Sequence, residues 1–101
     1  MLEVYRGFAM TLSFDVHVVV RDEVLSAEAG GDVVVMDPQT GSYFTFEGVG
    51  SDIWRRIGAP IAVSTLCDGL LQDYDAPADE IRTATLAFLG EMLEKRLIVA
   101  A

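Results

Sequence analysis

The stretch DPQTGSYFTFEGVGSDIW, residues 37–54, runs from a turn through a short aromatic strand directly into a helix. Pro38 fixes the backbone at the second position of a turn, and Gly41 supplies the left-handed residue that ends it. The next five residues, Ser42–Phe46, are rich in aromatic side chains, which favour a strand. We therefore expect a strand that turns back against its predecessor and then continues into a helix.

The two faces of this strand have different roles, because alternate side chains of a strand point to opposite sides. Phe44 and Phe46 lie on one face, and Tyr43 and Thr45 lie on the other. We assign Phe44 and Phe46 to the core, because the helices that follow must cover one face of the sheet.

Two further strand-like segments precede the turn. Residues 32–36 (DVVVM) come directly after Gly30 and Gly31, and residues 24–29 (VLSAEA) come before this glycine pair. A Gly-Gly pair accommodates the positive φ angles of a tight hairpin, so the two segments should pair antiparallel. With the aromatic strand they predict a three-stranded antiparallel meander. Residues 16–20 (VHVVV) form either an extra strand or a dangling arm.

Three helices are expected after the aromatic strand. The first covers residues 50–57, with Ser51 or Asp52 as its cap, and the second covers residues 64–74. The third is the longest and ends at about Arg96. A strand half followed by a helix half predicts an α+β fold, and 101 residues leave little room for a second domain.

The third helix is apolar over more than half of its circumference. Its apolar side chains form two neighbouring rows, the first with Ile81, Ala84, Phe88 and Met92 and the second with Leu86, Leu89, Leu93 and Leu97. Such a helix is either buried on more than one side or keeps one side for a partner. The pattern leaves both interpretations open.

Charge and composition restrict the partners. The formal net charge is −9, from 16 acidic and 7 basic side chains, and it repels a phosphate backbone. We expect no nucleic-acid partner, and a basic peptide or a basic protein surface fits better. No apolar run reaches the roughly 18 residues that span a bilayer, so we expect no membrane partner.

The single cysteine, Cys67, excludes a disulfide within the chain and is typical of a reducing compartment. We therefore expect a cytoplasmic protein. The first residues lack a basic region and a cleavage site, so they do not resemble a signal peptide. We interpret residues 1–15 as a flexible or extra N-terminal segment that precedes a single domain of residues 16–101.

No combination of residues points to catalysis. His17 is the only histidine and lies far along the chain from Cys67, so neither a metal site nor a nucleophile with its base is indicated. No Lys or Ser/Thr follows Gly30 and Gly31 at the spacing of a phosphate loop. We expect no enzyme activity, no metal and no cofactor.

The aromatic strand instead fits a binding role. It ends the meander, so one row of its backbone groups has no partner within the sheet. An extended peptide can bind such an edge as an added strand, with backbone hydrogen bonds for affinity and side-chain pockets for selection. The long third helix would form the other wall of the groove.

The order and spacing of these pieces resemble the PqqD-like family, whose members are RiPP recognition elements that act as chaperones in peptide modification. The resemblance covers about residues 24–98 and rests on TGSYFTF, on the Gly and Ile-Trp of the first helix, and on FLGEMLEKRLI. It implies a winged-helix-like fold and a leader peptide bound on the third strand against the third helix. The implied peptide-binding residues are Ser42, Tyr43, Phe44 and Thr45 on the strand and Arg82, Leu86 and Leu89 on the helix.

Three positions depart from the family pattern. Phe46-Glu47 replaces a frequent Leu-Asn, and Arg96 replaces a Gly before the terminal leucine, so the helix ends nearby differ. Ala84 replaces an Asp of the third helix. The loss of this charge near the groove implies a different leader selectivity.

The resemblance implies non-catalytic capture of the leader of a ribosomally synthesised precursor and its presentation to a modifying enzyme. The partner enzyme would be a leader peptidase and cyclase of a lasso-peptide pathway, which we favour, or a radical enzyme or a pyrroloquinoline quinone pathway. The alternatives are a winged-helix DNA-binding regulator and a structural subunit of an enzyme complex. Whether the chain forms a homodimer through the same edge stays open.

Overall fold

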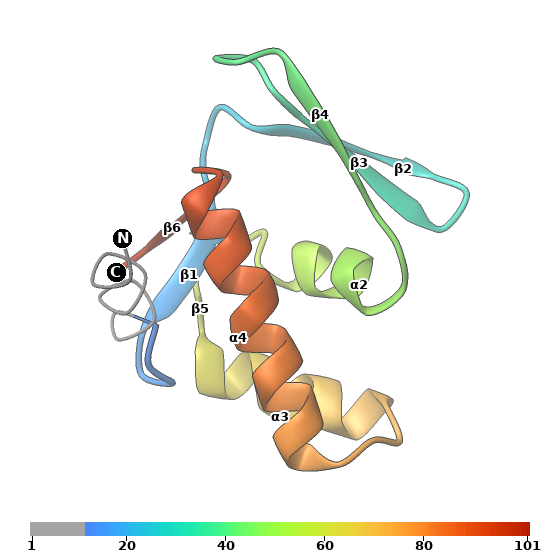
Figure 1. Cartoon of the computed structure of the whole chain (residues 1–101), viewed down its shortest axis with the longest axis vertical. Helices are drawn as coiled ribbons and strands as arrows, with labels where there is room; N and C mark the ends of the chain where they lie inside the picture. The colour runs from blue at the N-terminus through green and yellow to red at the C-terminus, as the bar shows by residue number, and fades with distance from the viewer. Residues whose placement is uncertain (1–11) are drawn as a thin grey trace.

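The computed structural model describes residues 12–101 and contains two antiparallel three-stranded sheets and three helices (Figure 1). In chain order the elements are β1 (His17–Val20), β2 (Leu25–Ala29), β3 (Asp32–Asp37), β4 (Ser42–Phe46), α2 (Gly48–Arg56), β5 (Ile61–Ala62), α3 (Val63–Asp73), α4 (Ala78–Glu94) and β6 (Ile98–Ala100). The α+β class, with an antiparallel meander and three helices, is confirmed. No helix of the described residues is long and apolar enough to cross a membrane.

The predicted meander is present, with strand order β2-β3-β4. Gly30 and Gly31 have φ angles of 62° and 93°, as the tight turn between β2 and β3 requires. β4 pairs antiparallel with β3, with Val35 opposite Phe44. β4 is therefore the terminal strand of this sheet among the described residues.

The segment VHVVV does not join the meander and is not a dangling arm. It forms β1, the central strand of a second sheet with order β5-β1-β6. Val18 of β1 is fully buried and lies opposite Ile61 of β5 and Ala100 of β6. The prediction lacked this sheet because β5 and β6 have only two and three residues, too few for a visible alternation.

The core lies between the two sheets and the helices. Val33 and Val35 of β3 are 2% and 0% exposed and face α2, whose Ile53 and Trp54 are also buried. The core also contains Leu12, a residue of the predicted N-terminal segment 1–15. The remainder of that segment, residues 1–11, lies outside the described residues.

Two helix ends differ from the prediction. α2 begins at Gly48 after Glu47, which has extended backbone and makes no side-chain capping bond. Ser51 and Asp52, the predicted caps, therefore lie inside the helix. α4 ends at Glu94, and Arg96 adopts a φ of 61° that turns the chain into β6.

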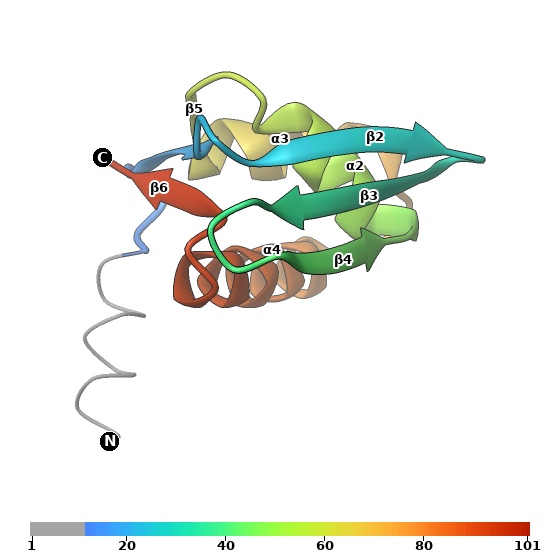
Figure 2. The same cartoon turned by 90° about the horizontal axis from the view of Figure 1, so that it is seen from above.

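β4 runs along the side of the meander nearest to α4, as the view from above shows (Figure 2). The meander lies over α2, and α4 extends from α3 up to the C-terminal strand (Figures 1 and 2). This arrangement places one edge of a sheet beside one face of a long helix.

Candidate functional site

The register of the meander determines which backbone groups of β4 are free. A two-residue hairpin turn closes on a hydrogen-bonded pair, which here is Ala29 and Asp32. Because bonding alternates along an antiparallel pair, Val34 and Met36 also bond to β2. The remaining residues of β3 direct their backbone groups toward β4.

In β4 the same alternation separates bonded residues from free ones. Phe44 and Phe46 lie opposite Val35 and Val33, so their backbone groups bond to β3. Tyr43 and Thr45 direct their N–H and C=O groups away from β3, and no described residue outside β3 forms a hydrogen bond with them. Two donors and two acceptors therefore line the open edge of the sheet.

Aromatic side chains form the inner side of this edge. The ring of Phe46 lies 5.3 Å from that of Trp54 and 5.2 Å from that of Phe88, measured between centroids, and the second pair is edge-to-face. Phe44 and Phe46 are half-buried, as predicted for residues that face the core. Such pairs contribute about 0.5–1.5 kcal/mol beyond their burial, so they hold β4 at a fixed position beside α4.

The face of α4 beside β4 is defined by contacts at both ends of the strand. Phe88 contacts Phe46, and the Lys95 ammonium lies 5.7 Å from the centroid of the Phe44 ring. Glu91 lies between them and forms an ion pair of 3.3 Å with Lys95. With the exposed Ala84 these side chains form one row at helical spacing, which we call the α4 row: Ala84, Phe88, Glu91 and Lys95.

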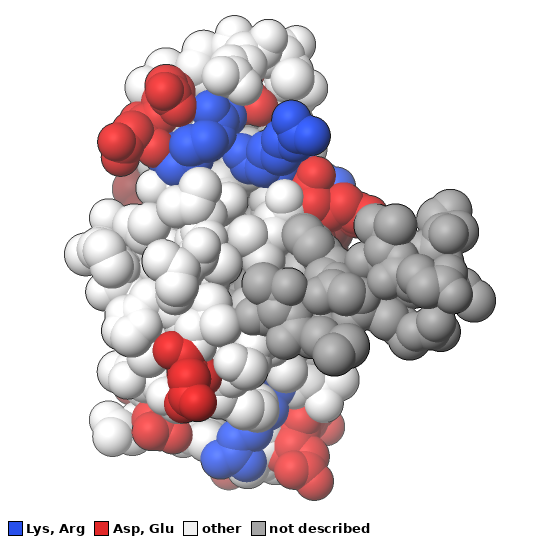
Figure 3. Space-filling model, turned by 90° about the vertical axis from the view of Figure 1, so that its left-hand side faces the viewer, with Lys and Arg blue, Asp and Glu red and all other residues white. Residues whose placement is uncertain are grey.

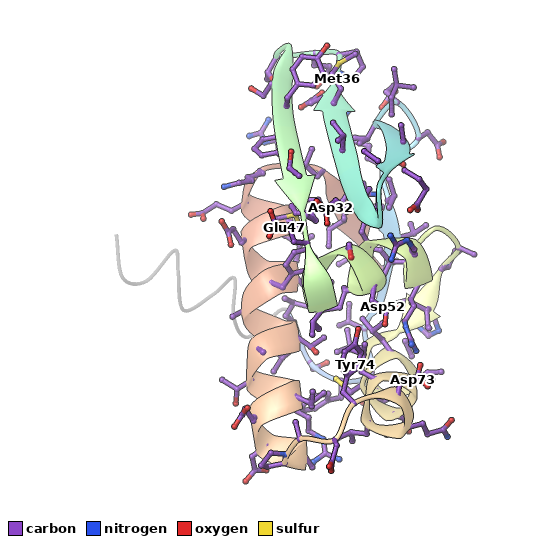
Figure 4. The ribbon with its side chains drawn as sticks, turned by 90° about the vertical axis from the view of Figure 1, so that its right-hand side faces the viewer. Asp32, Met36, Glu47, Asp52, Asp73 and Tyr74 are labelled. Carbon is purple, nitrogen blue, oxygen red and sulfur yellow. The ribbon has the colours of Figure 1, made fainter. Side chains whose placement is uncertain are left out.

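The open edge of β4 and the α4 row run side by side, and Figure 4 shows β4 next to the C-terminal half of α4. One wall offers free backbone groups, and the other offers aromatic, aliphatic and charged side chains. This combination suits an extended peptide, which needs both backbone pairing and side-chain contacts.

Comparison with known proteins identifies the family. The family model described as "Coenzyme PQQ synthesis protein D (PqqD)" matches residues 32–98, which include both β4 and α4. The chain belongs to the PqqD family. A sequence comparison with curated proteins found no match.

A solved structure described as "TbiB1 in Complex with the TbiA(beta) Leader Peptide" has the same fold as this PqqD-family chain. The TM-score is 0.73 and the sequence identity is 28%, over 79% of this chain and 93% of that chain. The family resemblance predicted from the sequence is thus confirmed.

The helix residues that the resemblance suggested for peptide binding do not lie beside β4. Leu89 is 0% exposed and belongs to the core. Leu86 lies about 160° around the helix from Phe88, on the side of Gly90, where a Cβ atom would meet Leu12 at 3.9 Å. Arg82 is half-buried and lies toward α3, near Cys67. The structure therefore brings none of these three together with the strand residues.

The reason for this difference is the rotation of α4. Its core face consists of Ile81, Thr85, Leu89 and Met92, which are all at most 7% exposed. Because Thr85 is polar, an assignment that uses only rows of apolar residues omits it. Such an assignment places the core on a different face of α4. The α4 row was also hidden in the sequence, because it combines an alanine, an aromatic residue and two opposite charges. The sequence feature that could have revealed this row is the spacing from Phe88 to Lys95, which places both side chains on the same face of a helix.

The four predicted strand residues lie where expected. Ser42 and Phe44 are half-buried, and Tyr43 and Thr45 are exposed. All four belong to β4, and Tyr43 and Thr45 carry its free backbone groups. Their binding role stays a prediction that the family membership motivates.

A cluster of polar side chains connects α2 to the end of α3 in this PqqD-family chain. The Asp52 carboxylate accepts hydrogen bonds from Arg56 and, at 3.0 Å, from Tyr74, which joins α2 to α3 (Figure 4). The bond from Arg56 is the main reason that the pKa of Asp52 is lowered, and the bond to Asp52 raises the pKa of Tyr74. Arg56 also pairs with Asp73.

Within the described residues, no group of three or more His, Cys, Asp or Glu side chains is placed to hold a metal ion. Cys67 is buried, and its desolvation raises the pKa of the thiol, which disfavours the reactive thiolate. His17 is exposed on β1.

Basic side chains of the described residues are mostly neutralised by acidic neighbours. On the face in Figure 3 they gather in small groups beside acidic side chains rather than in a continuous strip. The basic residues in ion pairs are Arg21, Arg55, Arg56 and Lys95. A duplex-binding surface would need several free cations along one face.

Proposed function

We propose that this chain binds the leader segment of a ribosomally synthesised precursor peptide as an added strand on β4. The observation that carries the proposal is the pair of free N–H and C=O groups on Tyr43 and Thr45, beside the α4 row. The membership of the PqqD family and the fold shared with a leader-peptide complex support it independently.

The geometry determines which backbone groups and side chains of a guest strand would contact the protein. Guest residues that pair with Tyr43 and Thr45 form up to four backbone hydrogen bonds, each with a net contribution of about 0.5–1.5 kcal/mol. The guest residue between them directs its side chain inward, toward Phe44 and the α4 row. Backbone pairing supplies affinity for any extended segment, and the inward side chain supplies selectivity.

The chain acts without chemistry of its own and presents the precursor to a modifying enzyme. Holding the leader raises the effective concentration of the core segment at the enzyme, commonly into the millimolar range for short flexible connections. The solved structure with the same fold is a complex with a leader peptide, which supports a precursor leader as the ligand. Among the pathways that use such leaders we favour a lasso-peptide pathway, with a leader peptidase and a cyclase.

A titration tests this function. A candidate precursor peptide is divided into leader and core peptides, and each is titrated into the protein by calorimetry. We expect the leader to bind with micromolar or tighter affinity and the core peptide or a scrambled leader to bind at least tenfold more weakly. Equal binding of the leader and the scrambled leader would reject selective recognition.

A further inference from the structure

Arg21 lies in the link between β1 and β2 and connects the two walls of the proposed groove, which are β4 and the α4 row. Its side chain is 17% exposed, and all three guanidinium nitrogens donate hydrogen bonds. Nε donates to the Arg96 carbonyl at 2.8 Å, and Nη2 donates to the Asp37 carboxylate at 2.9 Å. Nη1 donates to Glu23 of the same link. We call the set Arg21, Asp37 and Arg96 the Arg21 bridge.

Asp37 carries this contact to the strand that would bind the guest. It is the last residue of β3, it is 4% exposed, and it pairs with Ser42, the first residue of β4. Its carboxylate also accepts the Gln39 N–H at 3.0 Å, and its carbonyl accepts the Gly41 N–H at 2.7 Å. A buried carboxylate needs such partners, because an unpaired charge away from water is costly. Arg21 therefore both neutralises Asp37 and holds the turn from which β4 begins.

On the helix side, the contact is to a residue with a strained backbone. Arg96 has a φ of 61°, in the left-handed region that residues other than glycine rarely occupy. Its N–H donates to the Leu93 carbonyl at 3.0 Å, and its own carbonyl accepts the bond from the Arg21 side chain. The Arg21 backbone N–H donates to the next carbonyl, that of Leu97, at 3.0 Å. One residue of the β1–β2 link thus fixes two adjacent carbonyls of the turn after α4.

The Arg21 bridge lies at the end of the groove that is away from α2. The turn between β3 and β4 is on the same side of the molecule as the C-terminal end of α4, whereas α2 lies below the opposite end of the meander (Figures 1 and 2). Near α2, packing of Phe46 on Phe88 holds β4 to α4. At the other end, the polar contacts of Arg21 take this role. Because Lys95 directly precedes Arg96, the same contacts also fix the last residue of the α4 row.

We propose that Arg21 is a positioning residue for the leader peptide, because it holds the turn before β4 against the end of α4 and so fixes the width of the groove. This inference rests on the proposed leader binding. A guest strand contacts both walls at once, so it needs them at one separation. A groove that is held at this separation before binding loses less conformational freedom when the guest enters. Arg21 precedes residues 32–98, so the part of the chain that matches the family model does not contain it.

The proposal requires the shape of the arginine side chain as well as its charge. A guanidinium presents planar donors in several directions, whereas a lysine has a single ammonium at the end of a flexible stem. Arg21→Lys should therefore keep the charge opposite Asp37 and lose the simultaneous bond to the Arg96 carbonyl. Arg21→Met keeps most of the aliphatic length and removes every donor.

The test measures, by calorimetry, the affinity of each variant for the leader peptide of the candidate precursor. Arg56→Met and Arg56→Lys are the matched controls, because Arg56 is also half-buried and also pairs with two acidic residues, Asp52 and Asp73. These partners lie on α2 and α3, away from the groove. NMR relaxation dispersion of the free proteins provides a second readout, because it detects motion of individual amides between microseconds and milliseconds.

We expect Arg21→Met to weaken leader binding at least tenfold, Arg21→Lys to weaken it about threefold, and both Arg56 variants to stay within twofold of the wild type. In free Arg21→Met, the amides of Gly41 and Ser42 should show relaxation dispersion that the wild type and Arg56→Met lack. Circular dichroism confirms that each variant folds. If Arg21→Met does not fold, Asp37→Asn takes its place, because it removes the charge that Arg21 contacts and keeps an oxygen for the Gln39 N–H.

Three results with a wild type that binds the leader would overturn the positioning role and leave the proposed function intact. The first is leader affinity within twofold of the wild type in the folded variant that lacks the Arg21–Asp37 contact. The second is an equal loss of affinity in Arg21→Met and Arg56→Met, which assigns the effect to general stability. The third is unchanged relaxation of the Gly41 and Ser42 amides, which shows that Arg21 does not hold this turn. Absence of leader binding by the wild type instead rejects the proposed function, and the positioning role with it.

Discussion

The Lys95 ammonium lies 5.7 Å from the centroid of the Phe44 ring and thereby connects the C-terminal end of α4 to the middle of β4. The same ammonium is held by Glu91 at 3.3 Å. An inward guest side chain would meet this pair first, because Phe44 is the inward residue between Tyr43 and Thr45. Lys95 is therefore positioned to influence which guest side chain is accepted.

Replacement of Lys95 should affect binding more than folding. A cation–π contact at an exposed site contributes about 0.5–1 kcal/mol, so Lys95→Ala should lower the free energy of unfolding by no more than about 1 kcal/mol. We expect leader affinity to fall roughly three- to tenfold, because the guest loses the aliphatic stem as well as the charge. Lys95→Met keeps the stem and separates the two effects. Calorimetric titration measures the leader affinity, and thermal melting measures the stability. Unchanged leader affinity in Lys95→Ala would show that the guest does not contact Lys95.

The edge of β4 can be tested by removing one backbone donor. Tyr43→Pro deletes the N–H that faces away from β3, and we expect leader affinity to fall at least tenfold. Ser26→Pro is the matched control, because the register directs the Ser26 N–H outward on the opposite edge of the same sheet. Both variants need a circular-dichroism spectrum like that of the wild type. Equal leader binding by folded Tyr43→Pro and folded Ser26→Pro would contradict strand addition on β4.

Leu89 and Leu86 should respond differently to substitution. Leu89 is fully buried, so Leu89→Ala should lower the free energy of unfolding by about 2–5 kcal/mol. Leu86 is half-buried on the side of α4 away from β4, so Leu86→Ala should cost less and leave leader affinity within twofold of the wild type. Denaturant unfolding and titration measure these effects. A folded Leu86→Ala that has lost leader binding would show that the guest lies on the other side of α4.

The Asp52 carboxylate should make stability depend on pH in acid. Its pKa is lowered in the folded state, mainly by the hydrogen bond from Arg56 and also by that from Tyr74. A lowered carboxyl pKa contributes stability that is present above the unfolded value of about 4 and is lost as the pH falls through the folded value. Because Asp52 is partly exposed, the effect is small. Below about pH 4, we expect the melting temperature of Asp52→Asn to fall less steeply with decreasing pH than that of the wild type. If the melting temperatures of the two proteins instead fall in parallel, the acid sensitivity comes from other carboxylates.

The sequence predicted the meander because its signals are local. Gly30 and Gly31 lie in a turn that requires positive φ angles, and Gly41 has a φ angle of 74°. Along Ser42–Phe46, the alternation of side chains separates residues that face the core from residues that face solvent. The second sheet was not predictable in the same way. Its strands β5 and β6 are short, and their pairing with β1 joins residues that are distant in the chain.

The strand half of the candidate site was predicted and the helix half was not. The edge of β4 follows from chain order, because β4 is the last strand of the meander. The rotation of α4 depends instead on tertiary contacts, namely the burial of the polar Thr85 and the packing of Phe88 on Phe46. A helix that is apolar on several sides does not reveal from its sequence which side faces the sheet.

The most direct test of leader binding on β4 is the protection of individual backbone amides. Hydrogen exchange is followed by NMR for the free protein and for the protein saturated with the leader peptide. Strand addition predicts that the N–H groups of Tyr43 and Thr45 exchange at least tenfold more slowly in the complex, while the outward N–H groups of Ser26 and Glu28 on β2 keep their rates. Saturated binding with unchanged exchange at Tyr43 and Thr45 would contradict the account.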